Sequence, residues 1–87
     1  MAKSSFADLN EKLEEAFNFL RAFTLGQRGF THRDGITAVR RVTELCDQMK
    51  ERFASGPHAA EAAAIVVVGR TRVLAANARL AILLRKE

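Results

Sequence analysis

The stretch from His58 to Lys86, HAAEAAAIVVVGRTRVLAANARLAILLRK, decides the fold of this chain. It contains no proline and a single glycine, Gly69. At about 1.5 Å per residue, a helix of this length spans roughly 43 Å. One of its faces repeats small or apolar residues at alternating spacings of three and four, which is typical of a helix packing against other helices. This row, the inner seam, consists of Ala59, Ala62, Val66, Gly69, Val73, Ala76, Leu80 and Leu83.

The opposite side of this stretch is also largely apolar, whereas a surface helix is normally polar there. Two shorter helices are too few to cover all of its large apolar residues, since the first helix could cover at most about 30 Å of a rod of roughly 43 Å, so part of this side needs a partner. We therefore predict a protein interface formed by Ile65, Val68, Arg72, Ala75, Arg79 and Ile82. The alternative is that a few exposed apolar residues have no function, as on many protein surfaces.

Two shorter helices are expected before this stretch. Apolar residues repeat with helical spacing over residues 6–23 and 36–53. Each run follows a capping box, in which a hydroxyl side chain and an acid three residues later bond each other's backbone N–H groups. The two boxes are Ser5 with Asp8 and Thr31 with Asp34. Gly26 ends the first helix and the pair Gly56-Pro57 ends the second. We expect helices at about residues 5–25, 32–54 and 58–86.

Three helices joined by short turns favour an all-α fold. The simplest architecture is a three-helix antiparallel (up-down-up) bundle with a long C-terminal helix, in one domain over residues 1–87. A domain of this size buries only about 60–65% of the surface that its unfolded chain exposes. Because its stability margin is thin, we also expect it to form an oligomer.

Composition and charge bear on the kind of partner and on the cellular location of the protein. The formal net charge of +4 favours an anionic partner without identifying one. The single cysteine excludes an intramolecular disulfide, and the N-terminal residues lack the apolar run of a secretory signal. Residues 59–84 are the most apolar region, but they include Glu61 and three arginines, each costing at least about 2.5 kcal/mol near a bilayer centre. We expect a cytoplasmic protein that does not enter the membrane.

The sequence shows no catalytic or metal-binding signature. Cys46 lies on an apolar stripe between Val42 and Met49, so we interpret it as a small buried hydrophobic residue and not as a nucleophile. His32 and His58 are far apart in the sequence, and no Cys/His cluster has a zinc-binding spacing. We therefore predict a non-enzymatic protein with no metal and no cofactor.

Arginines suggest an alternative function, the binding of an anion. The candidate residues are Arg28, Arg33, Arg40, Arg41, Arg70 and Asn77. The first two flank Phe30 near a helix N-terminus, where free N–H groups favour negative charge. Arg70 and Asn77 are seven residues apart and share one helix face, which we place nearer the buried side, where an arginine needs a partner. Alternatively, Phe30 closes the end of the bundle and the nearby arginines are only solvated.

These observations predict a protein–protein interaction module of the adaptor, small-chaperone or inhibitor type. It is expected to self-associate through the third helix, to bind another protein, or both. The alternative is a protein that binds nucleic acid or a small anionic ligand. The binding residues would be arginines of the loop between the first two helices and arginines of the third helix.

Overall fold

The computed structural model describes residues 5–86, and every regular element within them is a helix. The helices are α1 (Phe6–Thr24), α2 (His32–Arg52) and α3 (Ala59–Lys86). The prediction of an all-α fold with three helices is confirmed. The observed ends lie within two residues of the expected ones. α2 shows the largest difference because Phe53 leaves the helical conformation, with φ −120° and ψ 34°. The predicted domain also includes residues 1–4 and 87, which lie outside the described range.

Side-chain caps determine where α1 and α2 begin. The Ser5 hydroxyl accepts a hydrogen bond from the Asp8 N–H at 3.1 Å, and the Asp8 carboxylate accepts one from the Ser5 N–H at 3.5 Å. Thr31 and Asp34 repeat this arrangement at 3.2 and 2.8 Å. Each box satisfies two N–H groups that would otherwise lack a partner. Both capping boxes expected from the sequence are therefore present.

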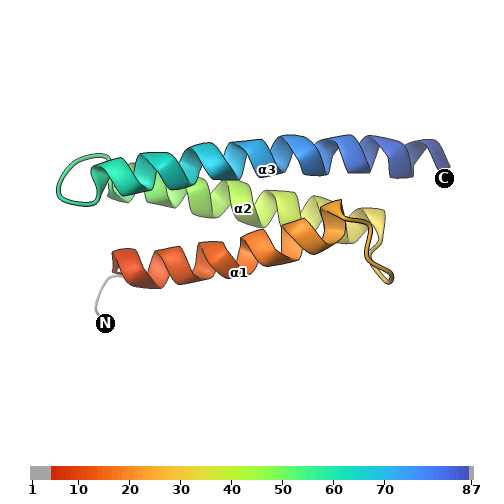
Figure 1. The fold of residues 1–87 in the computed structure, drawn as a ribbon, viewed down its shortest axis with the longest axis horizontal. Helices are drawn as coiled ribbons and strands as arrows, with labels where there is room; N and C mark the ends of the chain where they lie inside the picture. The colour runs from red at the N-terminus through yellow and green to blue at the C-terminus, as the bar shows by residue number, and fades with distance from the viewer. Residues whose placement is uncertain (1–4, 87) are drawn as a thin grey trace.

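The three helices lie side by side along the long axis of the molecule. Figure 1 shows the α1–α2 turn at one end and the α2–α3 turn at the other. α3 is the longest helix and runs past the ends of α1 and α2. The molecule measures 46 × 25 × 15 Å along its principal axes. The last turns of α3 therefore have fewer helix neighbours than its first turns.

The core lies between the helices and uses the predicted apolar rows. The large buried side chains, all from α1 and α2, are Leu9, Leu13, Leu20, Phe23, Val42, Leu45 and Met49. From α3, the residues Ala62, Val66, Gly69 and Ala76 are buried, and the other members of the inner seam are half-buried. The inner seam thus faces the core as expected. Its small residues let α3 lie close to the large side chains of the other two helices.

Two glycines lie where helices approach most closely. A Cβ atom at Gly69 of α3 would overlap the Cys46 sulfur of α2 and would lie 3.4 Å from the Phe17 ring of α1. A Cβ atom at Gly35, in the first turn of α2, would overlap the Phe23 ring. Any larger residue at either position requires its neighbours to move, because protein cores are closely packed.

Aromatic rings close the end of the bundle that holds the α2–α3 turn. Phe6, at the start of α1, stacks on His58 with a centroid distance of 4.3 Å. The same Phe6 ring meets Phe53 edge to face at 5.2 Å. The first turn of α1 therefore holds both sides of the α2–α3 turn.

Candidate functional site

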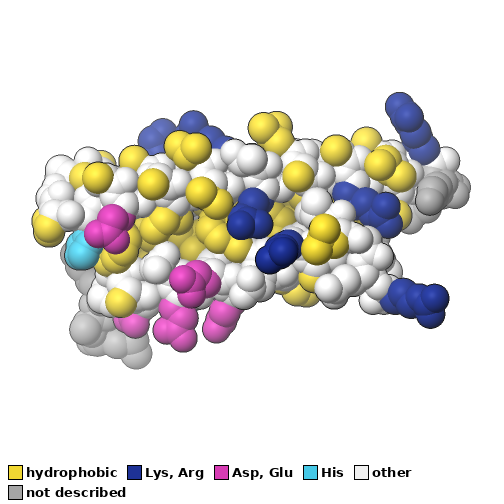
Figure 2. Space-filling model, viewed as in Figure 1, with side chains coloured by type: hydrophobic (Ala, Val, Ile, Leu, Met, Phe, Trp, Pro, Cys, Tyr) yellow, Lys and Arg dark blue, Asp and Glu magenta, His cyan; other side chains and the backbone are white. Residues whose placement is uncertain are grey.

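α3 exposes more large apolar side chains than the rest of the described chain. Eight such side chains are exposed within the described residues, and five belong to α3. They are Val67, Val68, Leu74, Ile82 and Leu84. Figure 2 shows apolar side chains along this helix, which is uppermost in the view. A concentration of exposed apolar surface on one element is typical of an interaction site.

A second row of residues with packing spacing runs along α3 beside the inner seam. This outer seam consists of Ala60, Ala63, Val67, Arg70, Leu74, Asn77, Ala81 and Leu84, all of them exposed. Val67 and Leu74 are 61% and 70% exposed. Alternating spacings of three and four allow one helix to pack along another. α3 therefore has one packing row toward the core and a second toward solvent.

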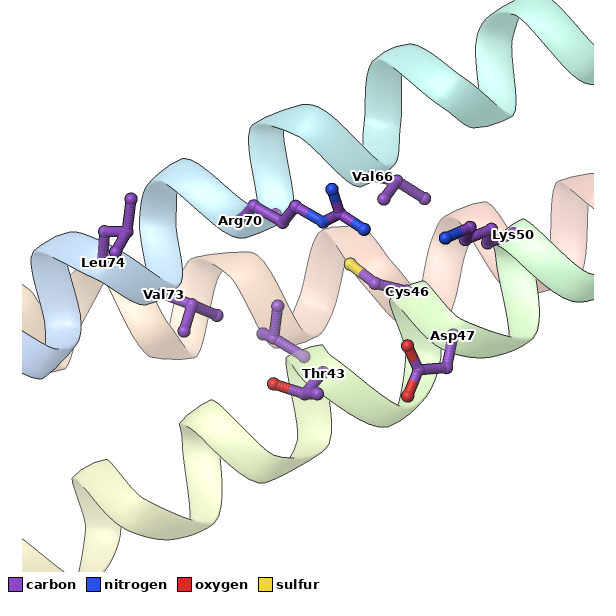
Figure 3. Close-up of a pocket in the computed structure, with 10 residues that line it drawn as sticks. Thr43, Cys46, Asp47, Lys50, Val66, Arg70, Val73 and Leu74 are labelled. Carbon is purple, nitrogen blue, oxygen red and sulfur yellow. The ribbon is translucent and has the colours of Figure 1, made fainter.

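The outer seam borders a groove between α2 and α3. Figure 3 shows the central hollow of this groove, about 390 Å³ in volume, with Cys46 between the helices and Arg70 extending toward it from α3. A second hollow of about 370 Å³ shares Lys50, Val66 and Arg70 with the first. A third, of about 400 Å³, shares Thr43 and continues toward the start of α2. The hollows thus form one groove that follows α2 and α3 along much of their length.

The Cys46 thiol in this groove is unsuited to nucleophilic chemistry. Burial raises the pKa of Cys46 above its ordinary value, and the Asp47 carboxylate raises it further, whereas the Arg70 guanidinium lowers it. The thiol is free, and Cys46 is only 7% exposed. Because the thiolate is the reactive form, a buried thiol with a raised pKa reacts slowly. Cys46 therefore packs as the small hydrophobic residue expected from the sequence.

The described residues form neither a membrane-spanning helix nor a metal-binding cluster. In residues 5–86, no helix is both long enough and apolar enough to cross a membrane. The same part of the chain holds no group of three His, Cys, Asp or Glu side chains that could bind a metal ion. No family model, curated protein or solved structure matches this chain. The candidate site therefore depends on the surface geometry of the molecule itself.

The predicted interface row divides into a half-buried part and an exposed part. Val68, Ala75 and Ile82 are exposed as an interface requires, whereas Ile65, Arg72 and Arg79 are half-buried. The Arg72 guanidinium lies over the Phe17 ring of α1, 5.6 Å from its centroid. The Arg79 guanidinium lies against Gly26, where a Cβ atom would be 3.0 Å from it. Both arginines therefore already contact α1 or the residues that follow it.

The expectation that Arg70 and Asn77 lie nearer the buried side is wrong. Both residues are exposed, and both belong to the outer seam. The reason is the helical step of about 100° per residue, which turns Arg70 away from its buried neighbour Gly69 and toward the rim of the groove.

Val67 and Leu74 were not among the predicted interface residues. The sequence does contain a pattern that predicts them. Val67 and Leu74 continue the alternating three-and-four spacing of Ala60, Ala81 and Leu84.

The arginines in and just after the α1–α2 turn are exposed around a half-buried phenylalanine. Phe30 meets Phe19 edge to face at 5.1 Å and Phe23 at 6.4 Å. It therefore closes this end of the bundle, which is the alternative role that the sequence suggested for Phe30. Arg28 and Arg33 are exposed on either side of it in the sequence.

The fold separates the charges along the long axis. We define the basic end as residues 21–42 and 71–85, and the acidic end as residues 5–20 and 43–70. Within these described ranges, the basic end holds eight arginines and one acid, and the acidic end holds eight acids and four cations. The arginines are Arg21, Arg28, Arg33, Arg40, Arg41, Arg72, Arg79 and Arg85, and the acid is Asp34. Figure 2 shows the acidic side chains gathered over the half that holds the start of α1.

Proposed function

We propose that the protein is a non-enzymatic interaction module, an up-down-up bundle that self-associates through the exposed surface of α3. This proposal places it in the cytoplasm, as an adaptor, small chaperone or inhibitor. The observation that supports it best is the outer seam, where Val67 and Leu74 are 61% and 70% exposed on a helix that also packs on the core. A helix that is apolar on two sides gains stability when the second side is also covered.

The energy available from this surface can be estimated. Full burial of a valine or leucine side chain contributes about 1.5–3 kcal/mol, so covering the exposed parts of Val67 and Leu74 contributes roughly 1–2 kcal/mol each. In a twofold dimer both side chains count twice. The loss of translational and rotational freedom on association costs roughly 4–15 kcal/mol. The four side chains together contribute roughly 4–8 kcal/mol, which reaches only the lower part of this cost, so we expect Leu84 and the α2–α3 groove to be covered as well.

The test is the native mass of the protein, measured by size exclusion with light scattering. One chain has a mass of 9.6 kDa, and we expect the wild-type protein to have a multiple of this value. Leu74→Lys should shift it toward the single-chain mass, because a charge would enter the covered surface. The matched control is Leu25→Lys, since Leu25 is 67% exposed but does not belong to α3. Unchanged far-UV circular dichroism would show that both variants fold. A single-chain wild-type mass, or an unchanged mass for Leu74→Lys, would count against the proposal.

A second candidate function is the binding of nucleic acid at the basic end. It is supported by the eight arginines that gather there around a single acid. Arginine contacts to phosphates release counterions, so affinity falls as the salt concentration rises. Replacing Arg28 and Arg33 together by alanine should weaken binding to a labelled DNA duplex and reduce the salt dependence. The control is the pair Lys50→Ala and Arg52→Ala at the acidic end. Equal affinity of the two double variants would contradict this function.

A further inference from the structure

We propose that the partner of the outer seam is the outer seam of a second copy, and that the two α3 helices run antiparallel. This inference rests on the proposed self-association and adds its orientation, register and symmetry. Two independent observations support it: the position of Arg70 within the outer seam, and the separation of charge along the molecule.

The outer seam is complementary to itself when its direction is reversed. Its residues follow a heptad pattern with Ala60, Val67, Leu74 and Ala81 at one set of positions and Ala63, Arg70, Asn77 and Leu84 at the other. Reversal about a point between Arg70 and Leu74 brings each member of the first set opposite a member of the second. The resulting pairs are Ala60 with Leu84, Ala63 with Ala81, Val67 with Asn77 and Leu74 with Arg70. No member of the seam is left without a counterpart.

Arg70 decides between the two directions. In a parallel, in-register pair, equivalent heptad positions face each other, so Arg70 would face Arg70 of the second copy in a seam whose other members, apart from Asn77, are apolar. Two like charges brought together and partly removed from water repel each other strongly. In the antiparallel pair, Arg70 faces Leu74 of the second copy, and the two Arg70 residues are offset by about 6 Å along the helices, so their repulsion is weaker than in the parallel pair. The Arg70 stem can then pack on leucine while its guanidinium stays in the α2–α3 groove, where Figure 3 shows it extending from α3.

The charges outside the seam favour the same direction. A parallel pair places the two basic ends side by side, with eight arginines in each. An antiparallel pair places each basic end beside the acidic end of the other copy. Charges within about 8 Å of each other interact appreciably at physiological ionic strength, so the residues beside the seam contribute most. The complementary ends also align the two copies along their full length.

The arrangement can be tested by disulfide cross-linking in a Cys46→Ala background, in which the engineered cysteine is the only thiol. We expect an equal mixture of the Ala63→Cys and Ala81→Cys variants to form a disulfide between the two positions on oxidation. After trypsin digestion without reduction, mass spectrometry should detect the peptide of residues 53–70 joined to that of residues 80–85. In this arrangement, the two copies of position 63 lie about 27 Å apart along the helices, well beyond the roughly 7 Å limit for a disulfide.

Other outcomes separate this inference from the function on which it rests. A disulfide joining position 63 to position 63 would show a parallel pair and overturn the inference, while self-association would stand. A dimer by light scattering that forms no disulfide between positions 63 and 81 would likewise overturn it. A single-chain mass for the Cys46→Ala protein and for the wild type would contradict both proposals. Ala7→Cys, exposed on α1, measures the cross-linking that arises from random collision.

Discussion

Replacing Gly69 with alanine should destabilise the protein, although alanine is the better helix former. Alanine is favoured over glycine by about 1 kcal/mol inside a helix. At this position, however, the new Cβ would overlap the Cys46 sulfur and lie 3.4 Å from the Phe17 ring. Inserting a methyl group into a closely packed core costs about 1–3 kcal/mol. The expected net result is a loss of up to roughly 2 kcal/mol in the free energy of unfolding.

The Cys46→Ala background distinguishes overlap from other effects. Without the sulfur, the methyl group at position 69 has room, so Gly69→Ala should there stabilise the protein by up to about 1 kcal/mol. The effect of Gly69→Ala should therefore differ between the two backgrounds by about 1–3 kcal/mol. Urea unfolding followed by circular dichroism measures both values. Thr71→Ala, at an exposed position of α3, is the control and should have the same effect in both backgrounds. Equal stabilisation by Gly69→Ala in both backgrounds would refute the close approach of α2 and α3.

Two further predictions concern a cap and the buried thiol. Thr31→Ala removes the hydroxyl that accepts a hydrogen bond from the Asp34 N–H, and it should lower the free energy of unfolding, measured by urea denaturation, by about 1 kcal/mol. The control is Thr37→Ala, exposed within α2, which should have a smaller effect. Because burial raises the pKa of Cys46 in the folded state, its contribution to stability is complete below the ordinary thiol pKa and is lost as the pH rises through the folded value. The difference in unfolding free energy between wild type and Cys46→Ala should therefore shrink in alkaline solution; a constant or growing difference would contradict this.

The helices and the core could be predicted from the sequence because their signals are local. The Ser5 and Thr31 boxes determine where two helices begin, and both appear with the expected hydrogen bonds. The inner seam of α3 likewise follows from spacing alone. In each case the residues that decide the outcome lie within a few turns of one another.

The surface of α3 was less predictable because it depends on where the neighbouring helices lie. Spacing shows which residues share a face, but it does not show which flank α1 or α2 will cover. Arg72 and Arg79 contact α1 and the residues after it, while Val67 and Leu74 remain exposed at the rim of the groove. The acidic and basic ends were missed for a similar reason. Their residues are scattered along the chain and are brought together only when the three helices pack against one another.

The contact of Phe6 with His58 has a consequence for the order in which the molecule folds. The α2–α3 pair joins neighbouring parts of the chain and needs only a short turn to be closed. The stacking of Phe6 on His58, by contrast, joins residues separated by more than half of the chain, which carries a larger entropic cost. We therefore expect the first turn of α1 to dock late during folding. Amide hydrogen exchange should detect the reverse of this step, as loss of protection at the start of α1 before the middle of α2.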